Sequence, residues 1–338
     1  MIQKVRLQNY GRIKMLPETE CKRVNLILGE NGRGKTFLLK SLYSAIRCLE
    51  EYGKGDDVRT LSDILSEQLR WCFQAERIGD LVTKGTKEPL QFYMLDDNEE
   101  FSYSFTNGAE KKAGTIHNKH SRKQSNSIFL PAKEVLSLFD IIQEFSHRKQ
   151  FGFDSTYSDL VNALSIAPHR GKNHYAFRDA RTALENMLGG KADYDEKQRR
   201  WYYKEGSYRY SIGVASEGVK KISILDRLLA NGYLTKGSVV FIDELESALH
   251  PEAITTFLNI IALIAENMDI QFFISSHSYH VVKKLHLLAK GRRVPTACLS
   301  FQKDGSVEWA DLAKRIPSNS IIEESVRLYE EELDIDML

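Results

Sequence analysis

The sequence predicts an α/β domain built around a central, mostly parallel β-sheet. Two short apolar runs, residues 239–242 and 271–274, are separated by one helix-length segment, a pattern typical of parallel strands buried on both faces. A third apolar run at 24–28 ends in a glycine-rich turn, and apolar residues then recur at helical spacing over 37–49. Strand, glycine turn and helix therefore form the first clear structural unit.

The composition is that of an ordinary globular protein. Of 338 residues, 42% are hydrophobic and 28% are charged, which is enough apolar material for a sizeable core. The net charge of +1 gives no reason to expect nucleic acid or an acidic membrane as a partner. Four scattered cysteines favour reduced thiols. Without a signal peptide or a run of about 18 apolar residues, we expect a cytoplasmic protein that makes no membrane contact.

The other elements are predicted in chain order. An N-terminal strand turns at residues 9–11, and 61–69 is an amphipathic helix. Residues 90–95 and 101–105 are expected to pair as an antiparallel hairpin, because the second run alternates strictly between aromatic and serine positions. The basic stretch 117–123 is polar and lacks periodicity, so we expect an exposed loop there.

The second half begins with a short strand at 128–130, which Pro131 stops. Helices are predicted over 132–190, and a second hairpin is predicted around Gly206. A helix at 220–230 then precedes the first of the two apolar strands, and a helix at about 251–266 joins them. Asp334 and Asp336 are expected to belong to a frayed acidic tail.

No internal repeat or low-complexity linker divides the chain, so residues 1–338 are predicted to form one domain. Within it, residues 51–127 are interpreted as a β-rich and loop insertion, and residues 128–200 as a mainly helical subdomain. Residues 201–338 form the half that carries the later motifs.

The glycine-rich turn matches GxxxxGK[ST] in full, as GENGRGKT. Glycines let backbone N–H groups converge on phosphates, and the following helix adds the positive end of its dipole. The lysine supplies a charge for the β- and γ-phosphates, and the threonine hydroxyl is a ligand for Mg²⁺. The motif therefore predicts ATP and Mg²⁺ as cofactors, with a nucleotide-binding set of Asn31, Gly32, Gly34, Lys35 and Thr36.

Two carboxylates, Asp243 and Glu244, follow the apolar strand at 239–242. This position puts them at the C-terminal edge of the sheet, where α/β folds bind ligands. Asp243 is predicted to hold Mg²⁺ together with Thr36. Glu244 is predicted to be the catalytic acceptor that orients and deprotonates a water attacking the γ-phosphate.

Three further polar segments are informative when their order along the chain is considered together. Ser216-Glu217-Gly218-Val219 stands before a predicted helix, Ser247-Ala248-Leu249-His250 follows the carboxylate pair, and Ser275-Ser276-His277-Ser278 follows the last apolar strand. Each segment alone is more often an ordinary polar loop. Their shared order beside a phosphate loop is what makes coincidence a poor explanation.

With these motifs the sequence resembles the ABC-type P-loop ATPase heads grouped with RecF, the SMC proteins and the OLD-family nucleases. The matching text is VRLQNYGRI, GENGRGKT, FIDELESALHPEA and FISSHS, which lies in residues 1–50 and 201–285. The resemblance implies a homodimer, or a higher even-numbered oligomer, that sandwiches ATP. It implies that Ser216 and Gly218 grip the γ-phosphate bound by the opposite subunit, and that His277 is the catalytic switch histidine.

The sequence also departs from this family pattern. The glutamine expected after the strand at 128–130 is replaced by Pro131-Ala132-Lys133-Glu134, and the signature loop has Glu217 and Val219 at its usual glycine and glutamine positions. Long heptad arms are absent, which excludes an SMC-like coiled-coil protein. The roughly sixty residues after His277 lack the glutamate and DxD arrangement of an OLD nuclease.

The leading functional prediction is an enzyme, a Mg²⁺-dependent ATPase subunit that switches a separate effector, a nuclease or toxin, in bacterial anti-phage defence. This biological role rests on analogy. The alternative is a RecF-like repair clamp that binds DNA, with nucleic acid as a candidate partner of the 117–123 cluster and of Lys197, Arg199 and Arg200. A transporter subunit is disfavoured by the missing glutamine, and a binder without hydrolysis is disfavoured by Glu244 and His277.

Overall fold

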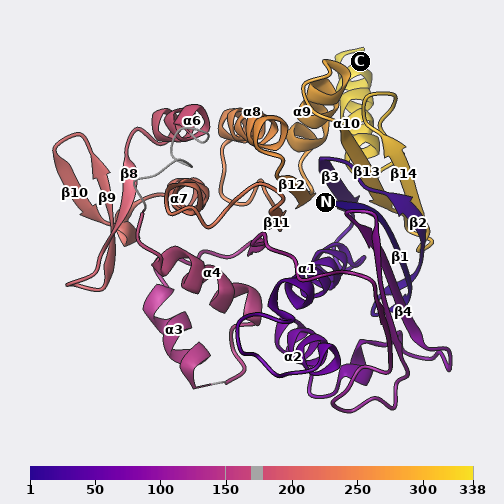
Figure 1. Ribbon diagram of the computed structural model, residues 1–338. Helices are drawn as coiled ribbons and strands as arrows, with labels where there is room; N and C mark the ends of the chain where they lie inside the picture. Colours follow the sequence, from indigo (N-terminus) through magenta and orange to yellow (C-terminus); the bar gives the residue numbers. More distant parts are fainter. Residues whose placement is uncertain (149, 169–177, 338) are drawn as a thin grey trace.

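The computed structural model describes residues 1–148, 150–168 and 178–337, and two large sheets organise the fold (Figure 1). The central sheet has the order β14 (Val307–Asp311), β13 (Thr296–Phe301), β3 (Val24–Gly29), β12 (Gln271–Ser275), β11 (Val239–Ile242) and β7 (Ile128–Leu130). Every neighbouring pair is parallel except β13 and β14. The predicted mostly parallel sheet is therefore confirmed, and the edge strand β14 is its antiparallel member.

The second sheet is antiparallel throughout. Its order is β2 (Ile13–Glu20), β1 (Ile2–Tyr10), β4 (Leu90–Asp96), β5 (Glu99–Phe105) and β6 (Thr115–Asn118). Both predicted hairpins of the N-terminal half are present, and the β4–β5 turn places Asp97 and Asn98 in the left-handed region. The Gln271 amide joins the two sheets, because it accepts from the Ile2 N–H and donates to the Ile2 carbonyl.

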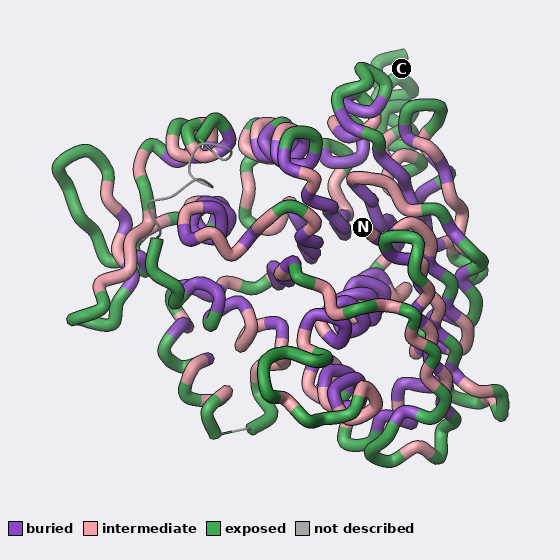
Figure 2. Tube along the Cα trace, viewed as in Figure 1, coloured by how far each residue is buried: buried purple, intermediate pink, exposed green. Residues whose placement is uncertain are grey.

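Two helices, α1 (Lys35–Glu51) and α2 (Leu61–Phe73), pack between the sheets (Figure 1). Alternate residues of the central strands, such as Phe241 and Phe273, face these helices. Their neighbours Val240 and Ile274 face the opposite core, which contains α8 (Pro251–Met268) and α9 (Tyr279–Lys290). Because strand side chains alternate between faces, the central sheet is buried on both sides, as the purple strands of Figure 2 show.

The helical region contains α3 (Phe139–His147), α4 (Ser155–Ser165), α6 (Arg178–Leu188) and α7 (Glu217–Ala230). Helices predicted within 132–190 are thus present, and residues 169–177 lie outside the described residues. A small three-stranded sheet follows α6, formed by β8 (Lys191–Asp195), β9 (Arg200–Glu205) and β10 (Tyr208–Ser211). The β9–β10 hairpin was predicted, whereas β8 was not. Two short 3₁₀ helices are η1 (Ile78–Leu81) and η2 (Ile212–Val214).

The predicted frayed tail is wrong. Asp334 and Asp336 belong to α10 (Ser320–Asp336), a helix capped by the Asn319 side chain, which accepts from the Ile322 N–H. Arg327 pairs with Glu324 and Glu331 one turn away on either side, and such pairs support an exposed helix. In the described part of the chain, no helix is both long and apolar enough to span a membrane.

The predicted exposed loop at 117–123 is only partly correct: residues 119–123 lie outside any helix or strand and Lys119 is exposed, but the rest differs. His117 and Asn118 belong to β6, and the Lys123 ammonium is only 8% exposed, 2.6 Å from the buried carboxylate of Asp96. Arg122 donates to the Glu50 carbonyl at 3.3 Å. The basic residues were mistaken for solvated ones because their partners, at the β4–β5 turn and at the end of α1, are distant in the sequence.

Candidate functional site

The phosphate-loop motif joins β3 to α1, as predicted. Gly34 has φ +107° and is the residue that precedes the first turn of α1, a conformation that glycine adopts without strain. A Cβ on Gly32 would lie 2.8 Å from the Arg12 guanidinium, which donates to the Gly32 carbonyl at 2.9 Å. The β1–β2 hairpin thus contributes Arg12 to the rim of the loop, a residue that the sequence interpretation did not single out.

Lys35 lies along the inside of the loop. Its ammonium donates to the Gly29 carbonyl at 2.9 Å and to the Glu30 carbonyl at 3.1 Å. Burial lowers the pKa of Lys35, and the nearby carboxylates of Asp243 and Glu244 oppose that shift. The loop therefore holds one cation beside the carboxylate pair, which is the charge arrangement that phosphates and a divalent cation need.

Thr36 and Asp243 lie together, as predicted. The Thr36 hydroxyl is 2.9 Å and 3.1 Å from the two Asp243 carboxylate oxygens. Ser275, at the end of β12, donates to the same carboxylate at 2.6 Å. Hydroxyl and carboxylate oxygens are suitable ligands for Mg²⁺, which proteins commonly hold with one or two carboxylates plus substrate phosphates. Accordingly, the described residues contain no cluster of three His, Cys, Asp or Glu side chains that would hold a metal without the nucleotide.

Hydrogen bonds hold the backbone of Glu244 in place, whereas its side chain extends toward solvent. It has φ +48°, a left-handed conformation that is unfavourable for a non-glycine residue. Its N–H donates to the Ser275 hydroxyl at 2.9 Å, and its carbonyl accepts from the Lys221 ammonium at 2.5 Å. The carboxylate itself is 45% exposed. The two hydrogen bonds set the backbone conformation, so the carboxylate projects from a fixed point toward solvent.

Lys221 and Ser275 are residues that the sequence interpretation missed as parts of the site. The Lys221 side chain is buried, and burial lowers its pKa to about 8 against the opposing influence of three acidic side chains. It lies on α7, five residues after Ser216, and the local signal is a lysine pair, Lys220-Lys221, near the start of an amphipathic helix. Its contact with a backbone carbonyl 23 residues away has no signature in the sequence.

His277 lies next to Glu244, with 4.0 Å between Nε2 and Oε1. Burial lowers the pKa of His277, and the positive charge of Lys35 lowers it further, so the neutral imidazole is favoured. The His277 N–H donates to the Glu246 carboxylate, whose second oxygen is buried without a hydrogen-bond partner. The predicted switch histidine and the predicted catalytic glutamate are thus brought together.

The predicted signature loop contacts the D-loop-like segment of the same chain. The Ser216 hydroxyl caps α7 by accepting from the Val219 N–H at 3.3 Å. A Cβ on Gly218 would lie 3.0 Å from the Leu249 side chain and 3.1 Å from the Ala248 carbonyl, so a larger residue here would force these neighbours to shift by a few tenths of an ångström. Among the hydrogen bonds of the described residues, none joins Ser216 to the phosphate loop.

The segment that replaces the family glutamine is Pro131-Ala132-Lys133-Glu134. It lies beside α7 and the D-loop-like segment, and together they line a cavity of about 300 Å³. The Ala132 carbonyl accepts from the Ser247 hydroxyl at 3.4 Å, and the Leu130 carbonyl accepts from the Asp243 N–H at 3.0 Å. Backbone carbonyls at and after the end of β7 are therefore the acceptors in the contacts with Asp243 and with the D-loop-like segment.

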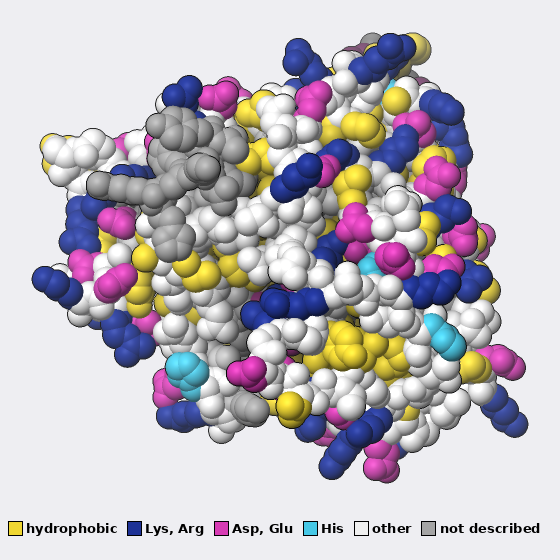
Figure 3. Space-filling model, in the orientation of Figure 1, with side chains coloured by type: hydrophobic (Ala, Val, Ile, Leu, Met, Phe, Trp, Pro, Cys, Tyr) yellow, Lys and Arg dark blue, Asp and Glu magenta, His cyan; other side chains and the backbone are white. Residues whose placement is uncertain are grey.

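The candidate DNA-binding residues fall into two groups: Lys197, Arg199 and Arg200 are exposed, whereas the basic residues of the 117–123 cluster are largely engaged by other side chains. Lys123 and Arg122 are engaged within the domain, and Lys119 pairs with Glu100 at 2.6 Å. On the face shown in Figure 3, basic and acidic side chains are interspersed, and they do not form one extended basic surface. This arrangement favours a mixed, solvated surface over a duplex-binding face.

Comparison with known proteins identifies the family. A family model described as "AAA domain, putative AbiEii toxin, Type IV TA system" matches residues 24–283, and the chain belongs to this family. An ATP/GTP phosphatase of Helicobacter pylori (strain ATCC 700392 / 26695) is 21% identical over 328 residues, which cover 84% of this chain and 87% of that protein. The resemblance to P-loop ATPase heads of the RecF, SMC and OLD class is thereby confirmed.

Solved structures of Smc heads share the fold. A Smc head bound to the C-winged helix domain of ScpA aligns with a TM-score of 0.56 at 13% identity, over 93% of this chain and 98% of that one. The Smc head of Pyrococcus furiosus, with an extended coiled coil and bound to the C-terminal domain of ScpA, aligns with a TM-score of 0.51 at 10% identity, over 98% of each chain.

Proposed function

We propose that this chain is a Mg²⁺-dependent ATPase whose two copies close on ATP, and that the closed dimer switches a separate effector protein. The observation that carries the proposal is the Ser275 hydroxyl, which donates to Asp243 and accepts from the Glu244 N–H. One side chain thereby fixes a metal-binding carboxylate and a solvent-facing carboxylate next to the phosphate loop. A protein that only held a nucleotide would not need the second carboxylate in that position.

The chemistry follows from the positions of these groups. Backbone N–H groups of the 29–36 loop and the Lys35 ammonium hold the β- and γ-phosphates, while Thr36 and Asp243 supply ligands for Mg²⁺. When bound, Mg²⁺ neutralises charge that develops on the phosphate oxygens. Glu244 accepts the proton of a water that attacks the γ-phosphorus in line, and the bond to the ADP oxygen breaks. Neutral His277 lies beside Glu244 and orients the same water.

The dimer completes the site. Gly218 lies against the D-loop-like segment of its own chain, and Ser216 and Gly218 act on the nucleotide of the opposite chain in the proposed arrangement. The polar cap of α7 then supplies a hydroxyl and backbone N–H groups to the γ-phosphate. Closure depends on ATP, because a signature loop without a γ-phosphate has little to bind.

The effector is proposed to be a separate protein, a nuclease or a toxin of an anti-phage defence system. Support comes from the family description, which refers to a toxin of a type IV system, and from the SMC-like heads, which are bound to a partner domain in their structures. The Helicobacter pylori relative is named an ATP/GTP phosphatase, which supports hydrolysis in this chain, and GTP deserves testing beside ATP.

A mixing experiment tests the composite site. Lys35→Ala removes nucleotide binding, and Ser216→Arg blocks the loop that acts in trans, so each protein alone should be inactive. A mixture should regain partial ATPase activity, because one of its two sites combines an intact Lys35 loop with an intact Ser216 loop. Native mass spectrometry verifies that subunits exchange. Exchange without recovered activity would contradict action in trans, and ATPase activity of Ser216→Arg alone would place the whole site in one chain.

A further inference from the structure

The C-terminal helix α10 is almost uncovered by the rest of the chain. None of its residues is buried, and its contact with the core comes from Ile321 and Ile322 in the first turn. Beyond that turn, Val326, Tyr329 and Leu333 are 49%, 61% and 37% exposed. These three apolar side chains are three and four residues apart, so they form one stripe along the helix. An exposed apolar stripe of this kind is typical of a surface that binds another protein.

Carboxylates line both edges of this stripe. At about 100° per residue, one edge carries Glu323 and Glu330, and the other carries Glu332 and Asp336. No cation of the described residues lies within 4.0 Å of these four carboxylates. Arg327 lies on the opposite side of the helix and is occupied by Glu324 and Glu331. We call the stripe and its four flanking carboxylates the acidic face.

The neighbouring helix α9 has an exposed face of the opposite charge. Lys283, Leu287 and Lys290 are four and three residues apart and therefore share one side of α9, and Arg292 and Arg293 follow the helix closely. All five are exposed, with Leu287 at 52%. In the part of the chain that the structure describes, none of the four cations is within 4.0 Å of a carboxylate. We call these five residues the basic face.

The two faces complement each other, although they are not paired within one chain. Helices α9 and α10 lie side by side near the C-terminus (Figure 1), and yet no ion pair among the described residues joins them. Two α10 helices are disfavoured as partners, because carboxylates flank both edges of the stripe and like charges would meet. The basic face offers both an apolar side chain for the stripe and cations for its edges. A second copy of the chain therefore carries the complementary surface.

We propose that the acidic and basic faces join two copies of this chain, with α10 of each copy packed on α9 of the other. A two-fold axis closes this reciprocal exchange, so that both faces of both copies are used. The α10 stripe covers Leu287, and the flanking carboxylates pair with the lysines and arginines around it. None of the nucleotide-site residues belongs to either face. The contact is therefore distinct from the ATP-dependent closure proposed above and needs no nucleotide.

Sedimentation equilibrium of the full chain without nucleotide tests the contact. Exposed ion pairs contribute little each, so we expect copies to associate at high concentration and to separate at the dilution of chromatography. In low salt, the average mass should rise from the 38.7 kDa of one chain toward twice that value as the concentration increases. About 1 M salt should reverse this rise, because the Debye length falls to about 3 Å.

Two results of this measurement would contradict the proposal. The first is a protein that keeps the mass of one chain up to about 0.5 mM in low salt, which would leave both faces to a different partner protein. The second is a dimer whose mass does not respond to salt, because the proposed contact depends on charge. The experiment contains no ATP, so its outcome is separate from that of the ATPase proposal.

Charge reversal identifies the faces. Glu330→Lys with Glu332→Lys makes α10 basic, and Lys283→Glu with Lys290→Glu makes α9 acidic. All four positions are exposed, so both double variants should fold, and each alone should remain a single chain because like charges meet. An equal mixture should associate again, and native mass spectrometry should show the mixed pair, because every contact then joins opposite charges.

A matched control separates these faces from a general effect of charge. Lys54→Glu with Lys111→Glu changes the net charge as much as the α9 variant does, at two exposed positions outside both faces. This control should associate like the parent. Association of either charge-reversed variant alone at the level of the parent, or a mixture of the two that stays unassociated, would overturn the proposal.

Discussion

The two ends of α1 are both polar, and they are built in different ways. At the N-terminal end, Lys35 and Thr36 are the last two residues of a motif of eight consecutive residues, and their partners lie at the ends of neighbouring strands. At the C-terminal end, Arg47 contacts carboxylates from its own helix and approaches Asp159 of α4 at 3.7 Å. The first end is organised to receive a ligand at an open sheet edge, whereas the second joins α1 to the helical region through buried charges.

The difference between the two ends of α1 predicts which residues affect catalysis and which affect the stability of the fold. The Glu244 side chain is 45% exposed and its loss leaves the core intact, whereas the Arg47 side chain is only 12% exposed and its loss leaves carboxylates without a counter-charge. Variants at the first end should therefore change rates, and variants at the second should change the free energy of unfolding. Four predictions test this separation, in order of decreasing effect.

The largest effect is expected from Glu244→Gln. Without the acceptor for the water proton, the ATPase rate should fall about 10²–10⁴-fold. ATP binding should persist, because Thr36 and Asp243 are unchanged, and the variant should elute as an ATP-dependent dimer in size-exclusion chromatography with light scattering. Its melting temperature without nucleotide should equal that of the parent. A rate within threefold of the parent would contradict the assignment of the catalytic base.

Arg47→Met tests the other end of α1. Removing one member of a buried ion network leaves Glu50 and Glu51 uncompensated, so the free energy of unfolding should fall by about 3–5 kcal/mol. Chemical denaturation measures this change. Arg148→Met is the control, since Arg148, just past the end of α3, forms an exposed pair with Glu144 and should change stability by less than about 0.5 kcal/mol. Equal effects of the two variants would remove the distinction between the ends.

Lys221→Met sharpens the view of the first end. The variant deletes the donor that holds the Glu244 carbonyl, and loss of a hydrogen bond from a charged group is expected to slow hydrolysis about 10- to 100-fold. ATP affinity, measured by fluorescence titration, should change little. Lys221→Arg should restore part of the rate. Lys220 pairs with Glu217 at 2.7 Å, so Lys220→Met is the neighbouring control and should have a weaker effect on kcat.

The smallest effect concerns pH. Burial places the pKa of His277 below its ordinary value of 6.5, so the neutral form favours the folded state. The associated stability is fully present above pH 6.5 and is lost as the pH falls through the lower, folded-state value. The acid limb of the ATPase rate should accordingly lie below pH 6.5, and His277→Gln should remove that limb. An acid limb that is unchanged in this variant would assign the titration to another group.

The sequence by itself determined the sheet class and the order of the motifs. Local patterns can be recognised from consecutive residues. Three such patterns are present: apolar runs of strand length, a glycine loop of fixed spacing, and carboxylates directly after a strand. The central strands, both N-terminal hairpins and the meeting of Thr36 with Asp243 follow from them, because the C-terminal ends of adjacent parallel strands lie at one edge.

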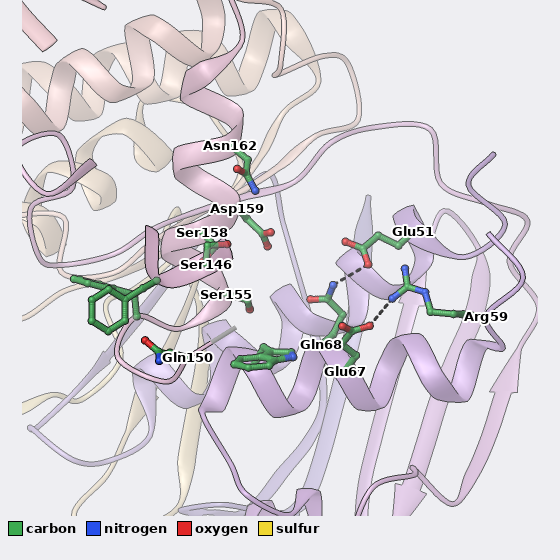
Figure 4. A pocket seen from close by; sticks show the side chains of 13 residues that line it. Glu51, Arg59, Glu67, Gln68, Ser146, Gln150, Ser155, Ser158, Asp159 and Asn162 are labelled. Atoms are coloured by element: carbon green, nitrogen blue, oxygen red, sulfur yellow. Dashed lines mark hydrogen bonds and ion pairs between the residues drawn. The ribbon is translucent and has the colours of Figure 1, made fainter. Parts of the chain in front are cut away.

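Only the tertiary structure decided which distant residues meet. The sequence predicts a solvated Lys123, but in the structure its ammonium pairs with the buried carboxylate of Asp96. Nothing in the sequence indicates that Lys221 donates to the Glu244 carbonyl. A cavity beside the C-terminal end of α1 (Figure 4) combines residues from four helices, α1 to α4, between positions 51 and 162, and no spacing in the sequence indicates it. The physical reason is that burial and partner choice set the environment of a charge, and both depend on packing between elements rather than on neighbours in the chain.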